Sequence, residues 1–261
     1  MSSVSSFKNI RILLLLCVLL FVVLNAWQVR ARTTSWKAPL WVVVYPINAD
    51  GSETTKNYID KLQHHHFESI ETFMAEQAQD YNLSLTRPVT VKVGPQIDEL
   101  PPRPPESSNI LAVMWWSLKT RYWASSITDQ YQRPPADIQM FVVYYDPQIK
   151  RVLDHSLGLQ KGLLGVVNAF ATRSVTEYNN VIITHELLHT VGASDKYNFQ
   201  TNRPVFPQGY AQPDLYPLYP QHKGEVMSGT IPVSDTEFVH PRSLHDIVIG
   251  KVTAIEINWL Q

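Results

Sequence analysis

The segment VIITHELLHTVGASDKY, at residues 181–197, carries two histidines and two acids within an apolar run. If this segment is helical, His185 and His189 lie on one face of the helix, one turn apart. Two neutral imidazoles at that spacing can bind one metal ion, and Zn²⁺ prefers such nitrogen ligands in a set of about four. Glu186 is rotated by about 100° from His185 and therefore borders the same face.

A third ligand can follow the predicted helix. Gly192 permits a backbone turn that a side chain would resist, so the chain can double back to offer Asp195. With His185, His189 and Asp195 as ligands, Zn²⁺ would lower the pKa of a bound water toward ~7. Glu186 could accept a proton from this water as it attacks a carbonyl, and then pass the proton to the leaving amine. The predicted reaction is hydrolysis of a peptide or similar amide bond.

The full pattern is more specific than a pair of histidines. In a chain of 261 residues with 9 histidines, H-E-x-x-H arises by chance roughly 0.01 times. The glycine and the acid that follow make a chance match rarer still. An isolated histidine pair is more often two packed helix residues, whereas the complete pattern favours a metal site.

Other histidines and acids could also serve as metal ligands. Glu225 and His222 are alternative third ligands, but Glu225 lies in a glycine-flanked turn with no helical Asn or Asp partner. The consecutive histidines at 64–66 would point about 100° apart on a helix, which is poor geometry for binding one ion. Asp195 is therefore the favoured third ligand.

The stretch HELLHTVGASD resembles the extended motif H-E-x-x-H-x-x-G-x-x-H/D of the metzincin zinc metallopeptidases. It resembles the variant with Asp as third ligand, as in secreted bacterial proteases of the snapalysin type. The resemblance implies a zinc endopeptidase acting on protein or peptide substrates, with a tight methionine turn downstream, and GEVMSGT at 224–230 supplies Met227. It also implies that Tyr197 could donate a hydrogen bond to the developing oxyanion. Specific resemblance is confined to residues 181–230.

The elements that must position these residues are also visible in the sequence. Ser174 and Glu177 form a capping-box pattern, which predicts a helix from about Val175 to Val191 with Gly192 as its left-handed stop. Ser107 and Ser108 can cap another helix. The β-branched and aromatic runs predict strands at residues 39–47, 89–93, 137–146 and 163–172, and helical periodicity predicts helices at 54–81 and 244–259.

This order predicts an α/β or α+β fold, with a mixed sheet, a long backing helix and the active-site helix. A proline-rich, weakly periodic stretch then predicts a loop-rich C-terminal subdomain that ends in a helix. We expect an N-terminal segment at 1–37 and a metallopeptidase domain at 38–261. Its sheet subdomain covers about 38–192, and its C-terminal subdomain about 193–261.

The N-terminus carries thirteen consecutive apolar residues, 12–24, between Lys8 and Arg11 on one side and Arg30 and Arg32 on the other. With their neighbours they predict a signal anchor with a transmembrane helix at about 10–27. The chain would then be a single-pass membrane protein with a periplasmic or extracellular catalytic domain. If the segment is instead a cleaved signal peptide, the product is a secreted soluble protease.

Charge and cysteine content restrict the possible partners. With 22 basic and 23 acidic residues and no basic block, nucleic acid is not an expected partner. Cys17 is the only cysteine, so the chain forms no internal disulfide and no thiolate metal site. An alternative from another class is a catalytically inactive, metzincin-like envelope protein that binds a partner. The intact Glu186 argues against it, because a purely structural zinc site has no use for a free carboxylate.

Overall fold

The computed structural model describes residues 3–105, 109–130 and 136–260, so the predicted capping residues Ser107 and Ser108 lie outside the described residues. The α-helices of the described residues are α1 (Ser3–Thr33), α2 (Glu53–Ile59), α3 (Glu68–Asp80), α4 (Ile110–Gln130), α5 (Thr176–Thr190) and α6 (Lys251–Glu256). The strands of the main sheet are β1 (Leu40–Asn48), β2 (Val89–Val93), β3 (Ile138–Tyr145), β4 (Leu157–Leu159) and β5 (Leu164–Phe170).

The main sheet has the strand order β2-β1-β3-β5-β4. The strands β2, β1, β3 and β5 run parallel, and β4 pairs antiparallel with β5 at one edge. The central strands are nearly continuous apolar runs, as expected for parallel strands that are covered on both faces. The prediction of a mixed sheet with helices is confirmed, and the four predicted strands form at or near their expected positions.

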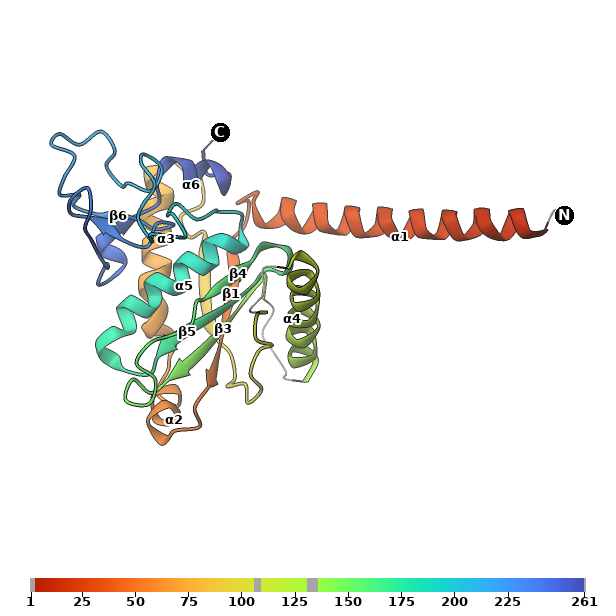
Figure 1. The fold of residues 1–261 in the computed structure, drawn as a ribbon, viewed down its shortest axis with the longest axis horizontal. Coiled ribbons are helices and arrows are strands. Elements are labelled where there is room, and N and C mark those ends of the chain that lie inside the picture. The colour runs from red at the N-terminus through yellow and green to blue at the C-terminus, as the bar shows by residue number, and fades with distance from the viewer. Residues whose placement is uncertain (1–2, 106–108, 131–135, 261) are drawn as a thin grey trace.

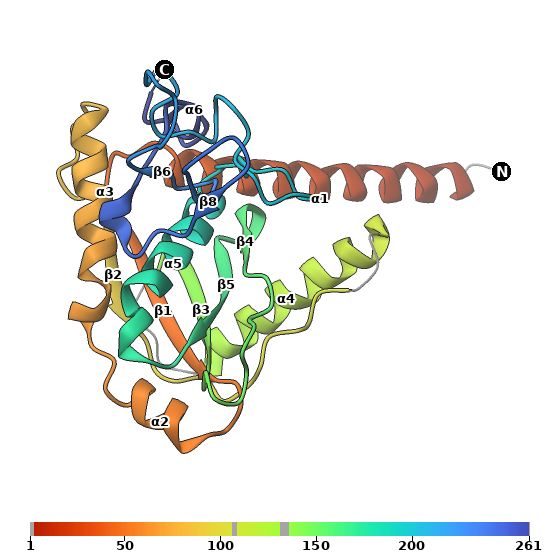
Figure 2. The same cartoon turned by 60° about the vertical axis from the view of Figure 1, so that its left-hand side comes forward.

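Alternate residues of the strands face two separate cores. Val42 and Val44 pack in the core that also holds the apolar residues of α3 and α5, whereas Val43 and Tyr45 face the core under α4. Helices α3 and α5 therefore cover one face of the sheet and α4 covers the other, as both views show (Figures 1 and 2). Helix α5 runs along the sheet with its C-terminal end directed toward the loop-rich part of the chain (Figure 1).

Helix α1 projects away from the rest of the chain (Figure 1), and its described apolar side chains are exposed. Within the described part of the chain, none of the helices combines the length and apolar character that crossing a membrane requires. The predicted transmembrane anchor at about 10–27, and with it the assignment as a single-pass membrane protein, is therefore wrong. The uninterrupted apolar run has thirteen residues, which is short of the ~20 that a spanning helix needs.

Two predicted helices are shorter than expected. The helix predicted at 54–81 is divided into α2, the 3₁₀ turn η1 (His64–Phe67) and α3. Gln63 has an extended backbone between α2 and η1, and its N–H donates to His66 Nδ1. The His66 side chain thereby caps the start of a new turn. The helix predicted at 244–259 is divided into the 3₁₀ turn η4 (Leu244–Asp246) and α6, because residues 247–248 form a short strand between them.

Residues 193–260 contain little regular structure. Their strands are two residues long and form two small pairs: β6 (Gly224–Glu225) with β9 (Ile247–Val248), and β7 (Ile231–Pro232) with β8 (Phe238–Val239). This region lies beyond the C-terminal end of α5 (Figure 1). Side-chain hydrogen bonds therefore have to supply order that backbone ladders supply in the sheet.

Candidate metal centre

Helix α5 carries both predicted histidine ligands on its last two turns. Its first turn departs from the prediction, because a 3₁₀ turn at Arg173–Val175 precedes it and Val175 is its N-cap without a side-chain cap. Ser174 is therefore inside that turn, and the predicted capping box with Glu177 does not form. The prediction for the other end holds, since the helix ends before Gly192, which has a φ of +115°.

The imidazoles of His185 and His189 face each other. Their Nε2 atoms are 3.1 Å apart and the rings are nearly perpendicular, with an interplanar angle of 83°. His185 Nδ1 lies 2.9 Å from the carbonyl of Val226, and His189 Nδ1 lies 2.8 Å from the carbonyl of Ala193. A carbonyl only accepts hydrogen bonds, so we assign the ring proton to Nδ1 in both neutral imidazoles. Both Nε2 lone pairs are then directed at the same point, as in metal-ligating histidines.

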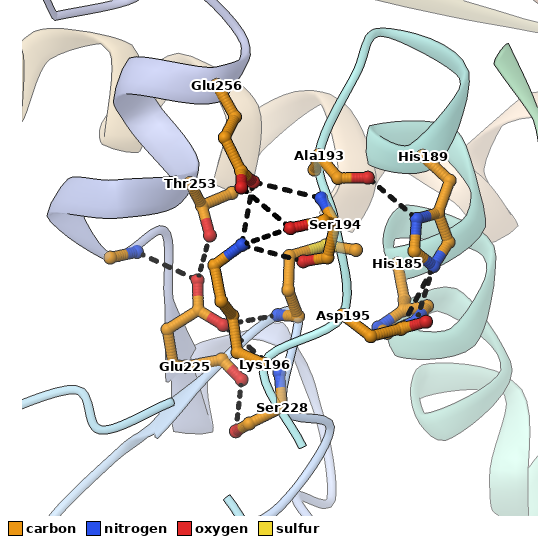
Figure 3. A network of polar contacts seen from close by, with 12 residues as sticks. His185, His189, Ala193, Ser194, Asp195, Lys196, Glu225, Ser228, Thr253 and Glu256 are labelled. Atoms are coloured by element: carbon orange, nitrogen blue, oxygen red, sulfur yellow. Dashed lines mark hydrogen bonds and ion pairs between the residues drawn. The ribbon is translucent and has the colours of Figure 1, made fainter. Parts of the chain in front are cut away.

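Asp195 completes a cluster of three ligand atoms. Its Oδ1 lies 3.2 Å from His185 Nε2 and 3.1 Å from His189 Nε2, and the carboxylate is partly buried. The arrangement is visible in Figure 3, where the loop after α5 brings Asp195 back over the two rings. His185, His189 and Asp195 form a cluster that could hold a metal ion.

The protonation equilibria of the cluster reflect its crowding. Burial lowers the pKa of His185, but the hydrogen bond to Asp195 and the charge of Glu186 outweigh burial and raise it to about 9. Burial raises the pKa of Asp195, but the hydrogen bonds from both imidazoles outweigh it and hold this pKa well below its usual range. Three converging lone-pair atoms thus attract a cation, and a proton on His185 competes with a metal ion for the same space.

Glu186 lies beside the cluster and is buried, with 5% of its surface exposed. Burial raises the pKa of its carboxyl, while the nearby histidines act in the opposite direction. Its Oε2 atom is buried and has no hydrogen-bond partner among the described residues. A buried, unpaired carboxylate oxygen is costly, so its presence indicates a group that is meant to be bound there.

The edge strand β4 passes over the same part of α5. A Cβ atom at Gly158 would clash with the carbonyl oxygen of Glu186 and would lie 2.6 Å from His189 Cβ. Only glycine permits this close approach. The sequence does not predict β4, because a three-residue strand is too short to show periodicity.

Met227, the residue predicted for a methionine turn, is fully buried. Met227 follows β6 in a tight turn that includes Gly229, with a φ of +69°. The carbonyl of Val226 accepts the His185 hydrogen bond, and the carbonyl of Met227 accepts from the N–H of Lys196. The turn therefore contacts both the ligand helix and the loop that carries Asp195.

Glu225 holds this turn and does not join the metal cluster. Its Oε2 accepts hydrogen bonds from the N–H groups of Met227 at 2.6 Å and Ser228 at 3.1 Å. Its Oε1 accepts from the N–H of Gly250 at 3.1 Å and from the hydroxyl of Thr253 at 2.6 Å. The carboxylate is fully buried, and four donors occupy it, which excludes it as the third ligand in this arrangement. The other alternative, His222, is exposed and outside the cluster.

The buried Lys196 and the partly exposed Glu256 form an ion pair next to Asp195, with Nζ 2.7 Å from Oε2. The pair surrounds Ser194, whose N–H and hydroxyl both donate to the Glu256 carboxylate. Figure 3 shows this network between α6 and the ligand loop. Sequence reasoning did not find it, because the two residues are 60 positions apart and neither belongs to the motif.

Tyr197 lies near the acids of the site. Burial and the charges of Asp195 and Glu186 raise the pKa of its hydroxyl to about 12, so it remains a proton donor. The histidine run lies elsewhere: His64 Nε2 is 3.0 Å from Glu71 Oε1.

Comparisons with known proteins give little independent information. No family model matches the sequence, and a search of curated proteins also found no match. Among solved structures, a "Structure of a chaperone-substrate complex" aligns at a TM-score of 0.41 and 11% sequence identity, over 84% of this chain and 34% of that one. The chain thus spans about a third of that neighbour's length, and a similarity this low carries no functional argument.

Proposed function

We propose that this chain is a zinc-dependent peptidase of the metzincin type, with Asp195 as the third protein ligand. One observation carries the proposal: His185 Nε2, His189 Nε2 and Asp195 Oδ1 lie within 3.2 Å of one another, next to the unpaired buried oxygen of Glu186. Two imidazoles and one carboxylate are a ligand set typical of catalytic zinc, in which one coordination position stays open.

The chain's own residues would divide the chemistry among them. When bound, zinc would activate a water and polarise the substrate carbonyl. Glu186, raised in pKa by burial, would accept the water proton and return it to the leaving amine. The Nδ1 hydrogen bonds of both histidines would keep the ligand nitrogens unprotonated and oriented. Tyr197, whose hydroxyl stays protonated, would stabilise negative charge on the carbonyl oxygen.

The edge of the sheet offers a place for an extended substrate. The strand predicted at 163–172 is β5, which is an interior strand paired with β3 on one side and β4 on the other. The outer edge beside the cluster is β4, whose Gly158 contacts the backbone of Glu186. An extended peptide could add to β4 as a further antiparallel strand.

Glu186→Gln is the sharpest test of hydrolysis, because it removes the base and keeps the side-chain volume. We expect casein hydrolysis by the zinc-loaded full chain to fall by about 10²- to 10⁴-fold, with no change in zinc content. Equal turnover by both proteins would refute the peptidase proposal. Zinc binding without turnover in either protein would favour the alternative of a metal-dependent binding protein.

Asp195→Ala tests the identity of the third ligand. We expect zinc stoichiometry to fall in this variant, as in His189→Ala, because two imidazoles alone bind the ion weakly. Metal analysis after equilibrium dialysis measures this. Full zinc retention in Asp195→Ala, together with loss in His189→Ala, would place the third ligand elsewhere.

Tyr197→Phe tests the oxyanion role. We expect kcat to fall by about 10²-fold with KM nearly unchanged, since the hydrogen bond would strengthen only in the transition state. Tyr210→Phe is a suitable control, because the Tyr210 hydroxyl bonds to Tyr219 instead. An equal effect of both changes would show that the loss comes from loop packing.

A further inference from the structure

The three proposed ligands are fixed to very different degrees by their own side chains. His185 and His189 belong to a regular helix, and each also donates from Nδ1 to a backbone carbonyl. The Asp195 carboxylate is in a loop, and among the described residues its polar contacts are with the Nε2 atoms of the two imidazoles. The position of Asp195 therefore depends on the backbone of its two neighbours.

Both neighbours of Asp195 are fixed by contacts with the C-terminal region. Ser194 donates its N–H to Glu256 Oε2 at 2.9 Å and its hydroxyl to Glu256 Oε1 at 2.6 Å. Lys196 donates its N–H to the carbonyl of Met227 at 2.9 Å. Figure 3 shows Glu256 and Lys196 on the side of the loop opposite the histidines.

The Lys196 ammonium closes this arrangement. Nζ donates to the carbonyl and the hydroxyl of Ser194, both at 2.8 Å, and to Glu256 Oε2 at 2.7 Å. All three of its N–H groups can thus be satisfied, although the side chain is only 6% exposed. A buried ion pair is on its own weak evidence for stability. Its geometry here, with two donors on Ser194 and the third on the Glu256 carboxylate that also binds Ser194, points to a role in orientation.

We propose that Lys196 and Glu256 are positioning residues that hold Asp195 in place as a metal ligand and thereby set the metal affinity of the site. The inference rests on the proposed function, because it assumes that the cluster binds zinc. Neither residue contacts the ligand atoms, so both act through the backbone of residues 194–196. Loss of such outer contacts typically lowers metal affinity by about 10- to 100-fold.

The test compares zinc affinity in three full-length variants by competition with a chromogenic chelator. Lys196→Met and Glu256→Gln are expected to weaken zinc binding by about 10- to 100-fold each. The matched control is Trp36→Phe, which removes a 2.6 Å hydrogen bond from Trp36 Nε1 to the Ile257 carbonyl, beside α6, without touching the ligand loop. Its zinc affinity should stay within about twofold of wild type, because Glu256 keeps its hydrogen bonds to Ser194 and Lys196.

Three further readouts separate orientation from general destabilisation. The double variant Lys196→Met/Glu256→Gln should bind zinc no more weakly than the single variant that has the lower zinc affinity, because both changes release the same loop. Thermal unfolding of the metal-free proteins shows whether Trp36→Phe is destabilised as much as Lys196→Met. With Co²⁺ in place of zinc, the visible spectrum of Lys196→Met should change, because the coordination of the ion changes, while that of Trp36→Phe should not.

The outcomes distinguish the two proposals. If wild type binds no zinc, the metal site and this inference both fail. If wild type binds zinc and Asp195→Ala does not, but Lys196→Met and Glu256→Gln bind like wild type, only the positioning role is refuted. Equal weakening in Trp36→Phe at equal loss of stability would also refute it.

Discussion

The two sides of the metal cluster are built from different kinds of structure. The histidines stand on α5, which packs against a five-stranded sheet through a continuous apolar core. Asp195 and Met227 lie in residues 193–260, where strands are two residues long and the carboxylates of the buried Glu225 and the partly exposed Glu256 bind backbone N–H groups. Backbone ladders and apolar burial order the first region, whereas charged side chains order the second.

This difference determines how strongly each region responds to a single substitution. Apolar packing is distributed over many residues, so a single change removes a small share of it. A carboxylate that binds several N–H groups concentrates the same role in one side chain, and its loss leaves all of those donors without a partner. The Asp195 side of the site should therefore be more sensitive to single polar substitutions than the histidine side.

The largest effect should come from Glu225→Gln. If the amide NH₂ faces the N–H groups of Met227 and Ser228, both of their hydrogen bonds are lost. If it faces Gly250 and Thr253, the Thr253 hydroxyl can turn to accept, but the N–H of Gly250 loses its partner. We expect the free energy of unfolding to fall by about 3 kcal/mol in urea denaturation.

The matched control for Glu225→Gln is Glu71→Gln on the sheet side. Glu71 is also buried, but both of its hydrogen bonds, from the N–H of Val91 and from His64, reach the single oxygen Oε1. A glutamine can keep both, so the expected loss is about 1 kcal/mol. Equal losses in the two variants would contradict the comparison.

Gly192→Ala should have an intermediate effect on the free energy of unfolding and should also weaken metal binding. At a φ of +115° a side chain is strained, and the new Cβ would lie 2.9 Å from Gln160 Nε2 and 3.3 Å from the carbonyl of Glu256. We expect a loss of about 2 kcal/mol in unfolding free energy and weaker zinc binding, because residues 193–196 must shift.

Gly229→Ala is the control for this glycine. Gly229 has a φ of +69°, but a Cβ there meets nothing within 4 Å. A loss of about 1 kcal/mol from backbone strain alone is expected, with zinc affinity unchanged. If Gly229→Ala weakens zinc binding as much as Gly192→Ala, the loop after α5 has no special part in placing the ligand.

The sequence predicts best the parts of the molecule whose order is local. Long apolar runs identify the buried strands at 39–47, 89–93, 137–146 and 163–172, and the spacing of His185, His189 and Asp195 around a glycine stop identifies the cluster. Both signals depend on residues within a few positions of each other. The motif was therefore readable even though the capping box expected at Ser174 does not form.

The missed features depend on contacts between distant residues. Glu256 reaches Ser194 across 62 positions, and Gln77 accepts from the N–H of Ile249 across 172. No periodicity records such pairings, so the sequence indicates no role for Lys196 and Glu256 and indicates Glu225 only as an alternative ligand. The membrane anchor predicted from the apolar N-terminal run is wrong for another reason. Flanking charges and hydropathy indicated an anchor, although the run is short.

The smallest effect concerns pH and compares metal-free wild type with Glu256→Gln. Burial raises the pKa of Glu256, but the hydrogen bonds from Lys196 and Ser194 outweigh burial and lower this pKa below its ordinary value of 4.5. A lowered acid pKa contributes stability above pH 4.5, and that stability is lost as pH falls through the folded-state value. The free energy of unfolding of wild type should thus exceed that of Glu256→Gln at pH 7. The difference should be only about 1 kcal/mol, because solvent screens the partly exposed carboxylate, and it should shrink on acidification.

Urea unfolding in the presence of a chelator, at pH values from about 3.5 to about 7, measures this difference in unfolding free energy. Asp154→Asn is the control, because its pair with Lys150 is at the surface, with the Asp154 side chain 77% exposed. Its difference from wild type should stay near zero at every pH, since exposed pairs contribute little. If the Glu256→Gln difference were equally flat, the Glu256 charge would not stabilise the ligand loop. The Asp195 side of the site would then owe its order to neutral hydrogen bonds, as the sheet side does.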